Sequence, residues 1–88
     1  MLVTKIDSFS KKYSNGSITG VVLAKKEGQF VTWNYTTFGG VDLIGMLKTK
    51  DTFETDSNNC YNGHYFPIMN TAFADLTKRI GEINNVRD

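Results

Sequence analysis

QFVTWNYTT, residues 29–37, is the stretch that decides the fold. Its β-branched and aromatic residues favour a strand. Alternation along that strand places three large residues on one face: Val31, Trp33 and Tyr35. The opposite face is mixed and holds Phe30, Thr32 and Asn34. We expect the aromatic face to pack beneath a C-terminal helix.

A second strand precedes it. Residues 18–26, ITGVVLAKK, are apolar without strict alternation, which is typical of a strand covered on both faces. Gly20 inside this run indicates a bulge or a close approach of another group. The KKEG connection, residues 25–28, predicts a hairpin in which Gly28 takes a positive φ.

The N-terminal segment predicts a short helix over roughly residues 4–14. Thr4 followed by Asp7 is similar to a capping box, and Ile6, Phe9 and Tyr13 recur at helical spacing. Asn15-Gly16 then provides a helix end, because Gly and Asn tolerate the left-handed conformation.

The middle of the chain leaves an alternative open. Residues 41–50, VDLIGMLKTK, fit either a third strand or a short helix. Residues 51–59 are polar and aperiodic, so we expect an exposed loop with Phe53 as an anchor. Asn62-Gly63 predicts the turn of a further hairpin, and Pro67 ends its second strand.

A C-terminal helix is predicted over roughly residues 71–84, with Asn70 as its N-cap. Its apolar stripe consists of Phe73, Leu76, Ile80 and Ile83. Lys78, Arg79 and Glu82 are expected largely outside that stripe. The predicted fold is a single α+β domain over residues 1–88. An antiparallel sheet of three to four strands carries the N-terminal and the C-terminal helix on one face.

Composition excludes several classes of protein. Ten basic and nine acidic residues give a net charge of +1, which provides little steering toward a polyanion and speaks against an acidic nucleic-acid mimic. A single cysteine excludes an intrachain disulfide. No apolar run approaches the ~20 residues of a membrane span. We therefore expect a soluble, cytoplasmic protein without a membrane partner.

The residues offer little catalytic chemistry. Cys60 and His64 lie four apart, but zinc requires three or four ligands. As a nucleophile and base, the pair would sit at the tip of the predicted Asn62-Gly63 turn, where water is poorly excluded. We predict no enzyme activity, no metal and no cofactor.

An aromatic sheet face also admits a nucleic-acid function. Trp33 and Tyr35, with Tyr65 and Phe66, could stack on bases, and Lys25 and Lys26 lie nearby for phosphate. A small single-stranded nucleic-acid-binding module is therefore the alternative function. The charge pattern does not support it, since the basic residues are scattered among acidic ones.

Three segments, VVLAKKEGQFVTWNY, NGHYF and AFADLTKRIGE, resemble small proteins encoded by phages and other mobile elements. The matching positions are Val31, Trp33, Gly63, His64, Tyr65, Phe66, Ala72, Asp75 and Arg79. Residues 38–60 are longer than in that outline, which indicates an inserted element. Some proteins of this size and origin, including anti-CRISPR proteins, bind and block a host defence complex. Many of these are acidic, and the charge of +1 departs from that pattern.

The resemblance implies a phage-type inhibitor that occludes a surface of a bacterial defence protein, such as a CRISPR effector. We expect a few aromatic and charged anchors to supply most of the binding energy. The predicted partner-binding residues are Lys25, Lys26, Trp33, Tyr35, Phe53, Asp56 and Tyr61. Whether Trp33 and Tyr35 belong to the core or to the contact is open, as is homodimerisation through an exposed edge or sheet face.

Overall fold

The protein forms one five-stranded antiparallel sheet with the order β4-β1-β2-β3-β5, in a computed structural model that describes residues 1–86. The strands are β1 (Leu2–Lys12), β2 (Ile18–Lys26), β3 (Gln29–Thr37), β4 (Thr52–Glu54) and β5 (Cys60–Phe66). The helices of the described chain are α1 (Leu43–Met46) and α2 (Met69–Asn84). The fold is mostly sheet, and the prediction of two terminal helices on a sheet of three to four strands is wrong.

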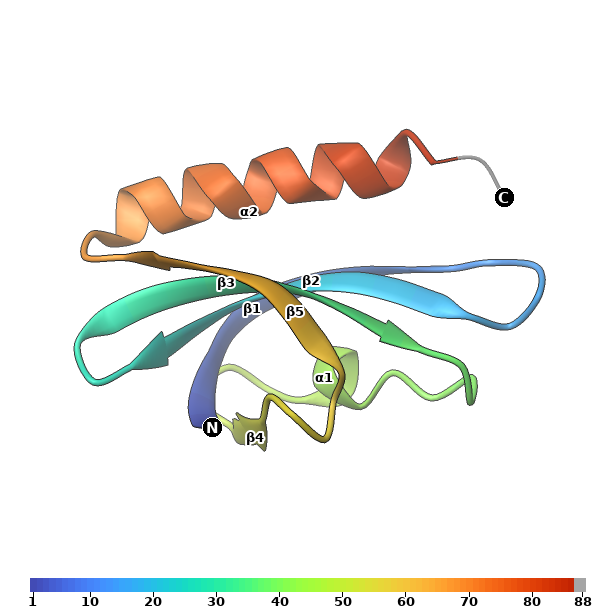
Figure 1. Cartoon of the computed structure of the whole chain (residues 1–88), viewed down its shortest axis with the longest axis horizontal. Coiled ribbons are helices and arrows are strands. Elements are labelled where there is room, and N and C mark those ends of the chain that lie inside the picture. The colour runs from blue at the N-terminus through green and yellow to red at the C-terminus, as the bar shows by residue number, and fades with distance from the viewer. Residues whose placement is uncertain (87–88) are drawn as a thin grey trace.

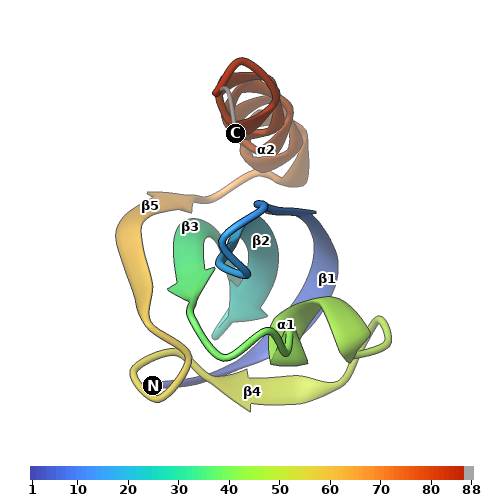
Figure 2. The ribbon, with the colours of Figure 1, turned by 90° about the vertical axis from the view of Figure 1, so that its right-hand side faces the viewer.

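The sheet curls because its two edge strands follow each other in the chain. β4 pairs with β1 and β5 pairs with β3, both in antiparallel fashion. A short turn over residues 55–59 joins β4 to β5, so the two opposite edges of the sheet are connected by consecutive segments of the chain. Viewed end on, the strands enclose a ring that α1 helps to fill (Figure 2).

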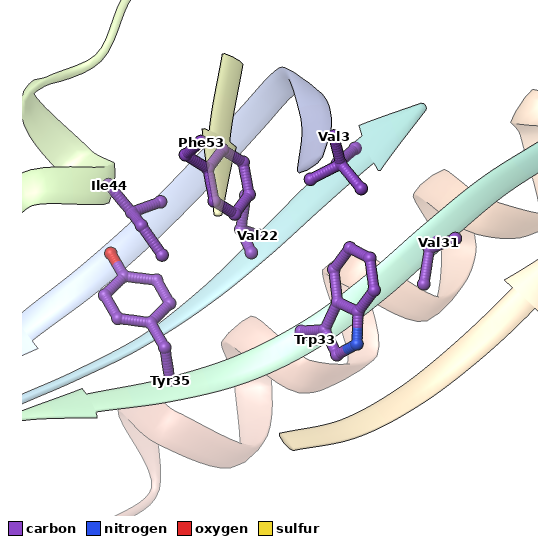
Figure 3. Packing of buried hydrophobic residues seen from close by; sticks show 8 residues of the cluster. Val3, Val22, Val31, Trp33, Tyr35, Ile44 and Phe53 are labelled. Atoms are coloured by element: carbon purple, nitrogen blue, oxygen red, sulfur yellow. The ribbon is translucent and has the colours of Figure 1, made fainter. Parts of the chain in front are cut away.

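The inside of this curl holds the first hydrophobic core. Its buried members are Val3, Val22, Ala24, Val31, Trp33, Tyr35, Ile44 and Phe53. Ile44 from α1 and Phe53 from β4 approach the sheet from the side opposite α2 (Figure 3). The aromatic face of β3 therefore packs inside the curl, and the prediction that it lies beneath the C-terminal helix is wrong.

α2 covers the outside of the sheet and forms the second core (Figure 1). The buried residues of this core are Val21, Leu23, Ala72, Leu76 and Ile83. The predicted stripe is rotated, because Arg79 is only 5% exposed whereas Phe73 is 38% exposed. The helix also starts earlier than predicted, with Ile68 at the N-cap and no side-chain cap.

β1 replaces the predicted N-terminal helix because a bulge imitates helical spacing. The pairing with β2 shifts between Lys5 and Asp7, so an extra residue enters the strand at Ile6. Residues three apart normally lie on opposite faces of a strand, but an extra residue reverses that relation. Ile6 and Phe9 therefore both pack against the core beneath α2.

A second bulge replaces the predicted Asn62-Gly63 turn. Thr32 pairs with His64 and Asn34 pairs with Tyr61, so Asn62 and Gly63 both lie opposite Trp33. Asn62 has a φ of 55°, the left-handed conformation that was expected for a turn. The dipeptide therefore bends β5 around the indole and does not reverse the chain.

Several local predictions are confirmed. β2 and β3 have the predicted bounds, and Glu27 and Gly28 at the turn between them have φ values of 49° and 81°. Residues 41–50 were left open between a third strand and a short helix, and the structure has the helix α1 there. Phe53 is buried as an anchor, although it lies on β4 in a segment predicted as loop.

Candidate functional site

A polar network joins the outer face of β3 to α2. Asp75 and Arg79 lie one helical turn apart, and Arg79 Nε donates to Asp75 Oδ2 at 2.8 Å. The Thr32 hydroxyl donates to the same carboxylate oxygen at 2.5 Å, and Arg79 Nη1 donates to Asn34 Oδ1 at 2.5 Å. The network therefore fixes the Arg79 guanidinium between a helix and a strand.

Burial and charge act in opposite directions on Asp75. Burial alone would raise the pKa of its carboxyl group. The hydrogen bonds from Thr32 and Arg79, with the positive charge of Arg79, outweigh burial and hold the pKa of Asp75 below its ordinary value. Asp75 is thus an ionised partner of Arg79 near neutral pH.

A pocket of about 220 Å³ opens beside this network, between α2 and β5. We call it the polar pocket, and its lining residues are Asn34, Asn62, His64, Asp75, Lys78, Arg79 and Glu82. His64 stands across from the helix, with Nδ1 3.9 Å from Asp75 Oδ1. The pocket therefore combines amide, imidazole and cationic groups from three elements.

The bulge in β5 separates the only cysteine from the only histidine. Cys60 pairs with Tyr35 and packs against the inner core, whereas His64 pairs with Thr32 on the side of α2. Burial raises the pKa of the Cys60 thiol to about 11, so little thiolate is present at neutral pH. The two side chains thus lie on opposite faces of β5 and do not form a nucleophile and base pair. Within residues 1–86 no group of three metal-ligating side chains is found.

A second surface lies on the opposite side of the molecule, around α1. Four large apolar side chains are exposed in one segment: Phe38 (81%), Val41 (52%), Leu43 (59%) and Met46 (73%). We call these four residues the α1 surface. A groove of about 440 Å³ adjoins it, lined by Leu43, Met46, Leu47, Thr52, Phe53, Glu54 and Asn58.

The α1 surface stands on a firmly held turn. The Asp42 carboxylate accepts hydrogen bonds from the backbone N–H three residues later, at 2.8 Å, and from the Tyr35 hydroxyl, at 2.9 Å. Lys5 Nζ donates to the carbonyls of Ile44 and Leu47, each at 2.7 Å. Burial lowers the pKa of Lys5, although the charge of Asp42 opposes this. Both ends of the helical turn are therefore anchored to the sheet.

The predicted partner-binding residues do not form one surface. Trp33, Tyr35 and Phe53 are buried in the inner core, and of these three only Phe53 contributes to the lining of the groove. Lys25 and Lys26 lie at the end of the β2–β3 hairpin, with Lys25 Nζ 6.0 Å from the centre of the Phe30 ring. Exposed Asp56 lies in the turn between β4 and β5, and exposed Tyr61 lies near the start of β5.

Sequence reasoning missed the network residues and the α1 surface. Asp75 and Arg79 are four apart, a spacing that signals a helical ion pair, but the sequence pattern places Arg79 largely outside the apolar stripe of the helix. Thr32 and Asn34 were placed correctly on one face of β3, with nothing to show that a helix carries their partners. Phe38 and Met46 give no sequence signal of exposure, since isolated apolar residues are usually expected in a core.

Comparisons of this chain with known protein families, with curated proteins and with solved structures find no match. Within residues 1–86 no helix is long and apolar enough to cross a bilayer.

Proposed function

We propose that this protein is a non-catalytic binding protein that covers a functional surface of a protein partner, and that the α1 surface is where the partner docks. The observation that carries the proposal is the exposure of Phe38, Val41, Leu43 and Met46 on one anchored segment. Large apolar side chains that are exposed together on one short segment are candidates for contact with a partner.

The adjoining groove indicates what the partner presents. Phe53, Leu43 and Met46 all contribute to its lining. A groove of about 440 Å³ accommodates one or two large apolar side chains. Met46 is unbranched and adapts its shape to such a group. The expected partner therefore inserts an apolar anchor, and its polar flanks meet Glu54 and Asn58 of the groove lining.

A bacterial defence complex in the host cytoplasm is the partner class that we propose, following the resemblance to mobile-element inhibitors. Residues 38–60, where an inserted element was expected, contain α1, β4 and all of the groove lining, and this supports their use in binding. Occlusion needs no catalytic group. It needs only a preformed surface, and the bonds of Asp42 and Lys5 provide one.

The nucleic-acid alternative has weaker support. Trp33 is 7% exposed and Tyr35 is fully buried, so neither ring can stack on a base in this state. The groove lining contains one acidic and no basic side chain, which disfavours a phosphate backbone there. Protein docking is therefore the function that the exposed groups support best.

Leu43→Glu and Met46→Glu test the proposal, because both side chains are exposed and the charge should leave folding intact. The matched control is Ile68→Glu, at an equally exposed apolar residue beside α2. Tagged proteins are incubated with nuclease-treated bacterial lysate, and captured proteins are then purified and titrated against each variant. We expect one partner whose affinity falls at least tenfold with either α1 variant and is unchanged in the control.

Each other result has a defined meaning. A partner bound equally by wild type and by both α1 variants would contradict docking at the α1 surface. Capture that disappears on nuclease treatment would favour the nucleic-acid alternative. A mass of two chains by light scattering that Met46→Glu reduces to one would identify a second copy as the occupant, and would contradict a host partner at this surface.

A further inference from the structure

We infer that the polar pocket is a binding site for a small oxyanion, either a phosphate or a carboxylate group on a compact ligand. The inference does not rest on the proposed docking role of the α1 surface, since the two sites lie on opposite sides of the sheet. The observation that carries it is the hydrogen bonding of the Arg79 guanidinium.

Arg79 is almost fully buried, yet its bonds within the described chain leave one end of the guanidinium available. Nε is bound to Asp75 and Nη1 is bound to Asn34. Nη2 makes no hydrogen bond with another side chain or carbonyl among residues 1–86, and Arg79 lines the pocket. A guanidinium held on two sides loses little freedom when its remaining donors engage an oxyanion.

Further donors surround this end of Arg79. Because Asn34 Oδ1 accepts from Arg79, the Asn34 amide keeps its NH₂ group as a donor. Asn62 and His64 line the opposite wall from β5, and Lys78 lies beside Arg79 on α2. Strand, bulge and helix thus direct two cations, two amides and an imidazole at one pocket. Such a set matches the several acceptor atoms of a phosphate or carboxylate.

The acidic groups at the pocket leave room for an anion. Thr32 and Arg79 both donate to Asp75 Oδ2, so the charge of this carboxylate is paired within the network, while its Oδ1 atom lies 3.9 Å from His64 Nδ1. Glu82 lies one turn beyond Lys78, toward the end of α2. The pocket is therefore close to neutral overall, and recognition depends on short hydrogen bonds more than on long-range attraction.

The volume limits the ligand. About 220 Å³ accommodates a phosphate or carboxylate with a small attached group, and is below the usual range of pockets for drug-sized molecules. An oligonucleotide or a lipid would have to extend along the surface outside the pocket. We therefore expect a compact anion to bind without further contacts.

Nuclear magnetic resonance titration tests the inference, because His64 is the only histidine and gives a single set of imidazole signals. Inorganic phosphate, methyl phosphate and acetate are added separately at constant ionic strength, with chloride as the reference. We expect saturable shifts of the His64 imidazole and the Asn34 and Asn62 amide signals. If phosphate binds more tightly than acetate, the ligand is assigned as a phosphate. If acetate binds more tightly, the ligand is assigned as a carboxylate.

Lys78→Gln is the principal variant, since Lys78 is exposed and its replacement should not unfold the protein. Binding should weaken about tenfold, because one charge-assisted bond is lost. Lys25→Gln at the distant hairpin end is the matched control and should bind as wild type does. Arg79→Lys retains the charge without the planar donors and should also weaken binding, provided its spectrum shows a folded protein.

Two outcomes would overturn the inference. The first is the absence of saturable shifts at the pocket residues up to tens of millimolar of all three anions. The second is equal binding by wild type and Lys78→Gln, or shifts spread evenly over the exposed lysines, which would indicate only general attraction to surface charge.

Discussion

Gly20 provides the space for the Tyr35 ring across the ladder between β2 and β3. The two residues are paired, and a Cβ atom at Gly20 would lie 2.2 Å from Tyr35 Cζ. Tyr35 cannot move away easily, because it is fully buried and its hydroxyl donates to Asp42. We expect Gly20→Ala to lower the free energy of unfolding by about 1–3 kcal/mol through overpacking.

Gly81→Ala is the matched control for this prediction. Nothing lies within 4 Å of a Cβ atom at Gly81, which is an exposed position inside α2. Its free energy of unfolding should rise by about 0.5–1 kcal/mol, because alanine is the better helix former. Urea unfolding measures both variants. A Gly20→Ala protein as stable as wild type would show that the close approach of Tyr35 is not a constraint.

At the scale of elements, Asp75 and Arg79 determine how firmly α2 is held on β3. Asp75→Asn leaves the buried Arg79 charge without its partner, so we expect the free energy of unfolding to fall by about 3–5 kcal/mol at pH 7. Because the pKa of folded Asp75 lies below its ordinary value of 3.8, ionised Asp75 stabilises the fold above that value. This stabilisation is lost as the pH falls through the lower pKa of the folded state. The difference in free energy of unfolding between wild type and Asp75→Asn should therefore become smaller in acid.

Urea unfolding at pH 7 and at pH 3 measures this difference. The double variant Asp75→Asn/Arg79→Met removes the orphaned charge and should lose less stability than the sum of the two single variants. Lys78→Gln, on the exposed side of the same helix, should change the free energy of unfolding by less than about 0.5 kcal/mol. A pH-independent difference for Asp75→Asn would contradict the assigned role of its ionised form.

The elements that could be predicted from the sequence are those whose signals are local. β2, β3, their turn and α2 follow from β-branched runs, a glycine with positive φ and an apolar period. β1 and β5 were mispredicted because each contains a bulge, and a bulge is fixed by pairing with a distant strand. The polar pocket could not be predicted for the same reason, since it requires β3, β5 and α2 to meet. Its chemistry was visible only as a spacing of four between Asp75 and Arg79.

At the scale of the whole molecule, one sheet serves two cores. Val22 faces the inside of the curl and Val21 faces α2, so adjacent residues of β2 belong to different cores. β3 likewise contributes residues to both cores. Neither core can therefore lose its packing while the other keeps an intact sheet, and the chain should unfold as one cooperative unit.

Trp33 and α2 report separately on this cooperativity. Trp33 is the only tryptophan and lies in the inner core, so its fluorescence follows that core, whereas the far-ultraviolet helical signal follows mainly α2. We expect the two signals to change at one urea midpoint. Leu76→Ala on α2 should lower the free energy of unfolding by about 2–5 kcal/mol. Although Leu76 belongs to the outer core, the substitution should lower the urea midpoints of both signals together. Thr77→Ala at the exposed neighbouring position is the control and should move neither. If Leu76→Ala lowered the helical midpoint while the fluorescence midpoint stayed in place, α2 would be a separately folding element and the shared sheet would not couple the two cores.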